Sequence, residues 1–209
     1  LFFAARNPHV VPGVDNAEPF KSIALIGEHP LFDKWQQAAQ RGELMLTRTP
    51  DANTELCLLA PGEDASACPS AMTVALQPLT ESAPATPLSL VLAERGPFHE
   101  LVNHSASASD QQRIALTLKA LRANVVVSKS HSVLSALHIA AQQASANDAL
   151  SALEQASLTL AQQDACYRES DIDLLAVEAL GYPRHLGGPH RQGTLQSNLS
   201  STPSKDAHS

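Results

Sequence analysis

The order of short apolar runs and helical segments is the feature that most constrains how this chain can fold. Up to about residue 128, apolar runs that suit buried strands alternate with segments of helical periodicity, and from there to residue 190 helical segments dominate. Alternation of this kind favours a mostly parallel sheet with helices on both faces. We therefore expect an α/β protein whose sheet domain is followed by a small C-terminal all-α subdomain.

Apolar and β-branched runs place the strands, and helical periodicity with capping signals places the helices. Strands are expected over residues 22–27, 43–47, 55–60, 71–76, 88–93, 100–103 and 125–127. Helices are expected over residues 31–41, 110–123, 132–143, 148–163 and 170–180. Beyond Arg191 the chain contains few apolar residues, so residues 193–209 are expected to form a disordered tail.

Composition argues against several classes of function. The formal net charge of −7 makes a basic surface for nucleic acid unexpected. The sequence contains no run of about 18 apolar residues, so no membrane span is expected. The cysteines Cys57, Cys68 and Cys166 form no CxxC pattern, and we expect free thiols in a reducing, cytoplasmic compartment. The first three residues include neither Met nor a basic signal region, which indicates a cut from a longer chain.

The most specific local pattern closes the segment 170–189, SDIDLLAVEALGYPRHLGGP. Gly181 permits a left-handed end to the preceding helix. Pro183 and Pro189 fix the loop, and the Gly-Gly pair before Pro189 lets it pass close to another backbone. The structural interpretation of this pattern is a tightly packed turn after a helix.

The same segment resembles the end of the 3-hydroxyacyl-CoA dehydrogenase part of multifunctional fatty-acid β-oxidation proteins, the alpha subunit of the fatty oxidation complex. The pattern in that family runs roughly Ser-x-x-Asp-Ile-Asp, then Gly-(Phe/Tyr)-Pro, then Gly-Gly-Pro. The start of the chain, LFFAAR (1–6), resembles the helix that ends the hydratase domain, and residues 11–13 resemble the linker after it. Weaker resemblance continues at HELVN (99–103) and VVVSK (125–129).

The resemblance implies a division of the chain into four regions. Residues 1–19 would be the end of a preceding helix and a linker, 20–130 a degenerate Rossmann-like domain, 131–192 a helical dehydrogenase-like subdomain, and 193–209 the tail. It also implies NAD as cofactor, acyl-CoA as ligand, and an N-terminal hydratase/isomerase domain or partner subunit as neighbour.

The expected cofactor site follows the first strand. The family needs Gly-x-Gly-x-x-Gly there, because the backbone must approach the pyrophosphate. Here only Gly27 matches, and it is the candidate cofactor-binding residue. Glu28 adds a negative charge, Pro30 lacks a backbone N–H, and Phe32 fills a position that requires glycine. Asp51 is the nearest candidate for the acidic residue that would hold a ribose hydroxyl.

Among the catalytic residues that the resemblance implies, His99 is the candidate base that would take the hydroxyl proton while hydride leaves for NAD. The family pairs this His with a Glu, but the matching position is Asn103, and an amide cannot stabilise an imidazolium by charge. The family's Asn aligns near Ser135, and Ser70 is a loose candidate for its Ser. His99 and His104 have no third ligand at a useful spacing, so no metal site is expected.

These residues support two main functions from different classes, and they leave open whether the chain is an enzyme. The first is a non-catalytic or weakly active dehydrogenase-like module, a pseudoenzyme that serves as scaffold or interaction domain. The alternative is an active NAD-dependent 3-hydroxyacyl-CoA dehydrogenase, an oxidoreductase of fatty acid metabolism with His99 as base. A third interpretation is binding of acyl-CoA without chemistry. Arg184, His185 and His190 would then offer donors to a CoA phosphate or a partner subunit.

Overall fold

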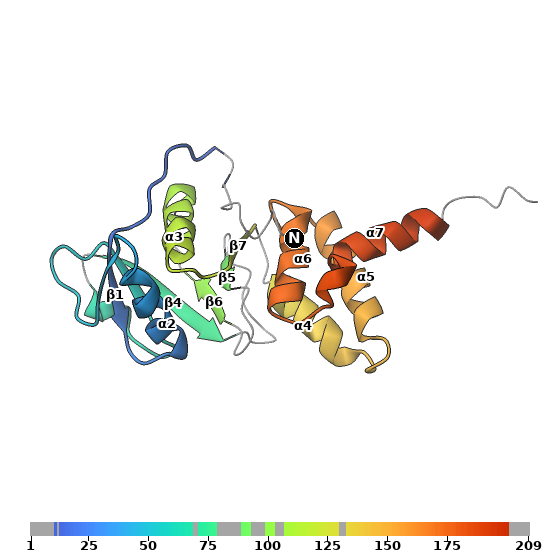
Figure 1. The fold of residues 1–209 in the computed structure, drawn as a ribbon, viewed down its shortest axis with the longest axis horizontal. Coiled ribbons are helices and arrows are strands. Elements are labelled where there is room, and N and C mark those ends of the chain that lie inside the picture. The colour runs from blue at the N-terminus through green and yellow to red at the C-terminus, as the bar shows by residue number, and fades with distance from the viewer. Residues whose placement is uncertain are drawn as a thin grey trace, which may run out of the picture.

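The computed structural model describes residues 11, 13–68, 71–78, 89–92, 99–102, 107–129 and 133–200. Figure 1 shows these residues as two lobes, one built on a β-sheet and one built of helices. Strands and helices make up the first lobe as far as β7 (Val125–Ser128), and helices alone follow. The α/β class expected from the sequence is confirmed.

All seven strands of the described residues lie in one sheet, in the order β2-β1-β3-β4-β6-β5-β7. They are β1 (Ser22–Ile26), β2 (Met45–Thr47), β3 (Leu56–Leu59), β4 (Met72–Pro78), β5 (Ser89–Leu92), β6 (His99–Val102) and β7. The four strands β2, β1, β3 and β4 pair in parallel. The other three join through antiparallel pairs, so the parallel part of the sheet is a four-strand block.

Two helices cover the same face of this sheet. α2 (Pro30–Ala39) and α3 (Ala108–Ala120) share one hydrophobic core with alternate residues of the strands. The largest buried side chains of this core are Phe32, Trp35, Ile114, Leu118, Leu121, Ile23, Leu25, Leu56, Leu58 and Leu76. Because strand side chains alternate between faces, this pattern fixes which residues of β1, β3 and β4 point toward the helices.

The opposite face of the parallel block has a different covering. Ala24, Cys57 and Leu59 point to it and pack with Cys68, which follows the short 3-10 helix η1 (Ala65–Ala67). The expectation of helices on both faces is therefore wrong for this block within the described residues. Among the described residues of the connection from β3 to β4, η1 is the one helix, and it is too short to replace a covering helix.

The second lobe contains α4 (Val133–Gln143), α5 (Ala149–Gln162), α6 (Glu169–Glu178), the 3-10 helix η2 (Arg184–Leu186) and α7 (Pro189–Ser200). Its core includes Leu134, Leu153 and Leu175 and also takes in Val126 of β7. A backbone bond from Lys129 to the carbonyl of Ala165, 2.8 Å long, joins the end of β7 to the helical lobe. The helices therefore pack directly on the last strand of the sheet.

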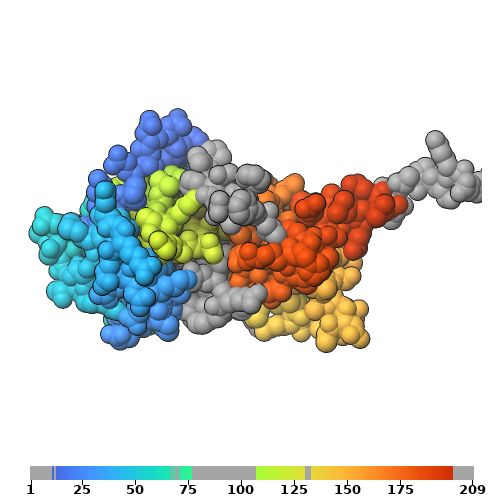
Figure 2. Space-filling model, in the orientation of Figure 1, coloured from blue at the N-terminus to red at the C-terminus, as the bar shows by residue number. Residues whose placement is uncertain are grey.

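Helix α7 contradicts part of the expectation for the C-terminus. Residues 193–200 were expected to be disordered, but they continue the helix that begins at Pro189. Gly193 lies close enough to α5 that a Cβ there would be 2.9 Å from Cδ1 of Leu158. Figure 2 shows α7 running along the helical lobe and past its edge, where Leu195 and Leu199 are exposed. Residues 201–209 of the expected tail lie outside the described part of the chain.

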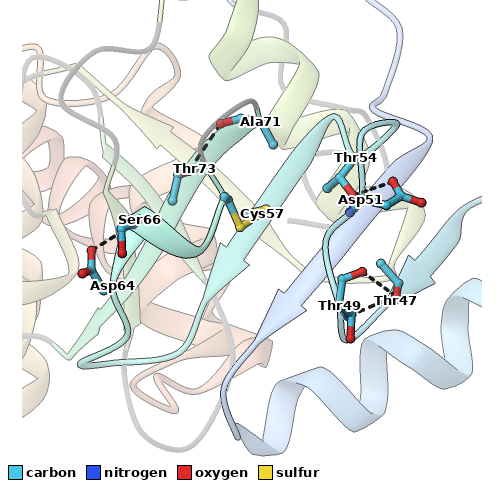
Figure 3. Close-up of a disulfide and its surroundings, with 10 residues drawn as sticks. Thr47, Thr49, Asp51, Thr54, Cys57, Asp64, Ser66, Ala71 and Thr73 are labelled. Carbon is cyan, nitrogen blue, oxygen red and sulfur yellow. Dashed lines mark hydrogen bonds between the residues drawn. A yellow bond between two sulfur atoms is a disulfide. The ribbon is translucent and has the colours of Figure 1, made fainter.

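The expectation of free thiols at Cys57 and Cys68 is wrong, because the structure joins them in a disulfide (Figure 3). The loop after β3 folds back over the strand and brings the two Cα atoms to 6.6 Å, within the range that disulfides span. Cys166 is free and buried. Burial raises the pKa of its thiol to about 12, so it stays protonated and unreactive near neutral pH.

Within the described residues, no helix has both the length and the apolar character needed to cross a membrane. The expected helix end at residues 1–6 lies outside those residues.

Candidate functional site

The carboxyl ends of β1 and β3 define the candidate site. After β1 the chain passes through α2 and adds β2 on one side of β1. The next strand, β3, lies on the other side of β1, and β4 follows beside it, so the strand order reverses direction at β1. In α/β proteins such a reversal of strand order opens the crevice in which ligands bind. The segments that follow β1, β2 and β3 are therefore the place where a dinucleotide would be held.

Gly27 follows β1 at this edge, and its φ of +83° is a conformation that glycine adopts without strain. A Cβ on Gly27 would lie 2.6 Å from both Cγ and Oε1 of Glu63. Glu63 comes from the loop after β3, where its N–H donates to the carbonyl of Ala60 at 3.2 Å. The exposed side chain of Glu63 therefore lies over the backbone that a pyrophosphate would have to approach, and Glu28 is exposed as well.

The N-terminus of α2 has its first backbone donors engaged by His29. Nδ1 of His29 accepts the N–H of Leu31 at 3.2 Å, and the His29 carbonyl accepts the N–H of Phe32 at 2.9 Å. Pro30 begins the helix and has no N–H to offer. In a dinucleotide site these donors point at the pyrophosphate, so this helix end lacks the usual anion-binding arrangement.

Arg48, in the segment after β2, also contacts residues at this edge of the sheet. Its Nη1 donates to the carbonyl of Gly27 at 3.0 Å, and its Nη2 lies 3.1 Å from Oδ1 of Asp33 in α2. The guanidinium carbon is 5.8 Å from the centre of the Phe32 ring. Sequence reasoning missed both Arg48 and Glu63, because no spacing pattern indicates which distant side chains reach Gly27.

Asp51, the candidate for the ribose-binding acid, stabilises its own loop instead. Its Oδ1 accepts the N–H of Asn53 at 2.9 Å and the hydroxyl of Thr54 at 3.1 Å. The Thr54 hydroxyl in turn accepts the N–H of Asp51 at 2.9 Å (Figure 3). These reciprocal bonds form a turn before β3 and give Asp51 a structural role.

The backbone of His99 begins β6 opposite Pro78, the last residue of β4. His99 therefore lies at the same edge of the sheet as Gly27, with β3 and β4 between their strands, or about 14 Å at the usual strand spacing. The His99 side chain, Asn103 and Ser70 lie outside the described part of the structure. Ser135 is buried on α4 in the helical lobe.

The closing motif joins α6 to α7 through Asp173. This buried carboxylate accepts the backbone N–H of His190 at 2.7 Å and also that of Arg191, in the first turn of α7. Burial raises the pKa of Asp173, and the two backbone donors oppose that effect. Gly188 has a φ of +128°, and a Cβ on it would lie 2.2 Å from Cγ of Asp173. The glycine therefore approaches a side chain, not the backbone that we expected.

Other residues of the motif also have structural partners. Asp171 is fully buried and accepts two bonds from the guanidinium of Arg168, at 2.7 and 3.2 Å. Gly181 has a φ of +76°, which confirms the left-handed helix end. The hydroxyl of Tyr182 donates to Oε1 of Glu154 on α5 at 2.8 Å. Burial and that carboxylate raise the pKa of Tyr182.

Two of the three donors suggested for a CoA phosphate face carboxylates of the chain itself. Nη2 of Arg184 lies 2.6 Å from Oε1 of Glu178. Nε2 of His190 lies 3.8 Å from Oε2 of Glu169. His185 is exposed. The motif therefore has the packing of a structural connection, and its donors do not converge on one point.

No group of three or more His, Cys, Asp or Glu side chains in the described part of the chain is placed to hold a metal ion. No protein-family model, curated protein or solved structure matches this chain.

Proposed function

We propose that this chain is a non-catalytic, Rossmann-like 3-hydroxyacyl-CoA dehydrogenase-like module of a fatty-acid β-oxidation protein. It serves as a scaffold or interaction domain beside a hydratase/isomerase domain. The observation that carries the proposal is the Glu63 side chain lying on Gly27, at the edge where a Rossmann-like domain holds its dinucleotide.

Electrostatics support the same conclusion. A carboxylate next to a pyrophosphate is repulsive. The nearby cation, Arg48, already lies on the carbonyl of Gly27 and on Asp33. The first donors of α2 are engaged by His29. Cofactor binding would require several of these contacts to break together.

The preserved folding features support a scaffold role. The closing motif has left-handed glycines, an ion pair between half-buried Arg168 and buried Asp171, and a cap on α7. A packed core tolerates many apolar substitutions, whereas catalysis requires specific groups at specific places. If a sequence has to preserve only its packing, catalytic residues are expected to be lost while the fold is retained.

A turnover assay separates this proposal from the active dehydrogenase. The chain is incubated with NADH and acetoacetyl-CoA, and oxidation of NADH is followed by absorbance, with His99→Ala as the matched variant. The scaffold proposal predicts that the chain and the variant give the same background rate. A rate that falls by about 10²–10⁴-fold in the variant would establish His99 as the base and contradict the proposal.

A further inference from the structure

The Cys57–Cys68 disulfide closes a ring of chain that contains the residue covering Gly27. Cys57 lies in β3, and Cys68 follows η1 after a sequence separation of 11 residues (Figure 3). Glu63 lies inside this ring and places its side chain on Gly27. The covalent bond therefore holds both ends of the segment that positions Glu63.

One backbone hydrogen bond ties the first part of the ring to β1, because the N–H of Ala60 donates to the carbonyl of Ile26 at 2.9 Å, and the other bonds are local. The N–H of Glu63 donates to the carbonyl of Ala60 at 3.2 Å, and Oδ1 of Asp64 accepts the N–H of Ser66 at 2.9 Å. Each of these local bonds spans two or three residues and shapes a single turn. The disulfide holds the other end of the segment, at Cys68, so reduction frees that end while the bond of Ala60 to Ile26 remains.

We propose that Cys57–Cys68 is a thiol–disulfide switch that controls whether Glu63 covers Gly27. In the disulfide form the ring is closed and the carboxyl edge between β1 and β3 is covered. In the dithiol form the ring opens, Glu63 moves away and the backbone at Gly27 becomes accessible. The switch does not depend on the proposed scaffold function, because it concerns the position of one loop.

The reductant is a dithiol of low molecular weight or a protein dithiol. One of its thiolates attacks the sulfur of Cys68, forming a mixed disulfide, and Cys57 leaves as a thiolate that takes up a proton. The second thiol of the reductant then attacks the mixed disulfide, releases Cys68 as a thiol and leaves the reductant oxidised. Two electrons move from the dithiol to the protein, and a glutathione disulfide reverses the step.

Because both cysteines are buried, reduction of the disulfide requires the protein to open locally first. Cys57 is 0% and Cys68 4% exposed, so a reductant reaches the pair only after local opening of the loop. Cys68 is the nearer sulfur to the surface because it lies in the segment after η1, whereas Cys57 is in a strand between two others. Opening of the segment around Cys68 is therefore the event that admits the reductant.

Hydrogen exchange of the full chain, before and after dithiothreitol, tests the ring. The amides of Glu63 and Cys68 are expected to exchange about tenfold faster or more in the dithiol form, and to recover after oxidation by glutathione disulfide. Amides of α5 are expected to keep their rates, and Cys166→Ala to keep the full response. Three free thiols after oxidation, or an equal acceleration in α5, would overturn the proposal.

The effect on Gly27 has its own readout. Gly27→Ala places a Cβ against Glu63, so we expect it to lower the melting temperature of the disulfide form by about 2–4 °C more than that of the dithiol form. Gly13→Ala is the matched control, because Gly13 has a similar φ of +82° with no atom within 4 Å of the added Cβ. Equal shifts for Gly27→Ala in both forms would show that reduction does not move Glu63.

Discussion

The carboxylate of Asp173 lies against Gly188, so close that a Cβ at position 188 would sit 2.2 Å from its Cγ. The same carboxylate accepts the backbone N–H of His190 in the first turn of α7. One side chain of α6 therefore caps the next helix, and glycine is required where the chain passes it. This relationship gives a physical reason for the Asp and the Gly-Gly-Pro of the closing motif.

Replacing Gly188 by Ala is expected to destabilise the protein by about 3 kcal/mol or more, because the added Cβ overlaps a buried carboxylate in a backbone conformation that Ala avoids. Gly181→Ala is the matched control. Gly181 also has a positive φ, but its Cβ would meet no atom within 4 Å, so the expected loss is about 1–2 kcal/mol. Urea denaturation measures both, and equal losses would contradict the close contact.

Removing the cap on α7 is expected to cost about 1–2 kcal/mol in Asp173→Ala. Asp173→Asn keeps an oxygen that can accept the His190 N–H and should retain most of the stability. The comparison is made by urea denaturation at neutral pH. If Asp173→Asn lowered the free energy of unfolding as much as Asp173→Ala, the hydrogen bond to His190 would not explain the stabilising effect of Asp173.

The pH dependence of stability is expected to carry the signature of Asp173. Its pKa is raised above 3.8 in the folded state, so the folded protein holds this proton more tightly than the unfolded chain. The tighter binding of this proton stabilises the folded state fully below pH 3.8, and this stabilisation is lost as the pH rises through the pKa of Asp173 in the folded protein. The free energy of unfolding of the wild type, relative to Asp173→Asn, should therefore fall as the pH is raised from 3.8. A difference that rises with pH in this range would contradict the burial of the carboxylate.

The bond between Tyr182 and Glu154 is expected to matter because it satisfies a buried carboxylate. Tyr182→Phe removes the donor and should cost about 1.5–3 kcal/mol. Thermal unfolding of the single variants and of the double variant with Glu154→Leu gives the coupling energy. Additive effects of the two substitutions would show that the hydroxyl and the carboxylate do not interact.

Reduction of the disulfide is expected to lower stability by about 2–4 kcal/mol, because the unfolded chain regains the freedom that the closed ring denies it. Thermal unfolding with and without dithiothreitol measures the loss. A variant with Cys57→Ala and Cys68→Ala should lose its sensitivity to the reductant, whereas Cys166→Ala should keep it. A reductant effect of the same size in the variant without both cysteines would contradict the pairing.

The sequence predicts the elements well because each has a local signal. Apolar runs mark all seven strands, and periodicity marks α2, α3, α4, α5 and α6. Strand direction has no such signal, and the antiparallel half of the sheet was therefore not expected. Helix α7 was missed because Asp173, far from it in sequence, caps it and because it packs on α5.

The candidate site was predicted only in part. The loss of the glycine turn after Gly27 is visible in the sequence, but the carboxylate nearest to Gly27 belongs to Glu63 and not to Glu28, the expected obstacle. Glu63 covers Gly27 from another loop, and a disulfide between residues of β3 and the following segment holds that loop. Such contacts depend on the path of the chain in space, which no spacing of residues encodes.

Titration of the chain with NADH, followed by nicotinamide fluorescence, measures whether the chain binds the cofactor at all. It is run on the disulfide and dithiol forms and on Glu63→Ala. The scaffold proposal predicts no saturable binding up to millimolar NADH in either form of the wild type, because His29 still engages the N–H groups of Leu31 and Phe32 when Glu63 moves and Pro30 has no N–H. Saturable binding with a dissociation constant in the micromolar range would contradict the scaffold function.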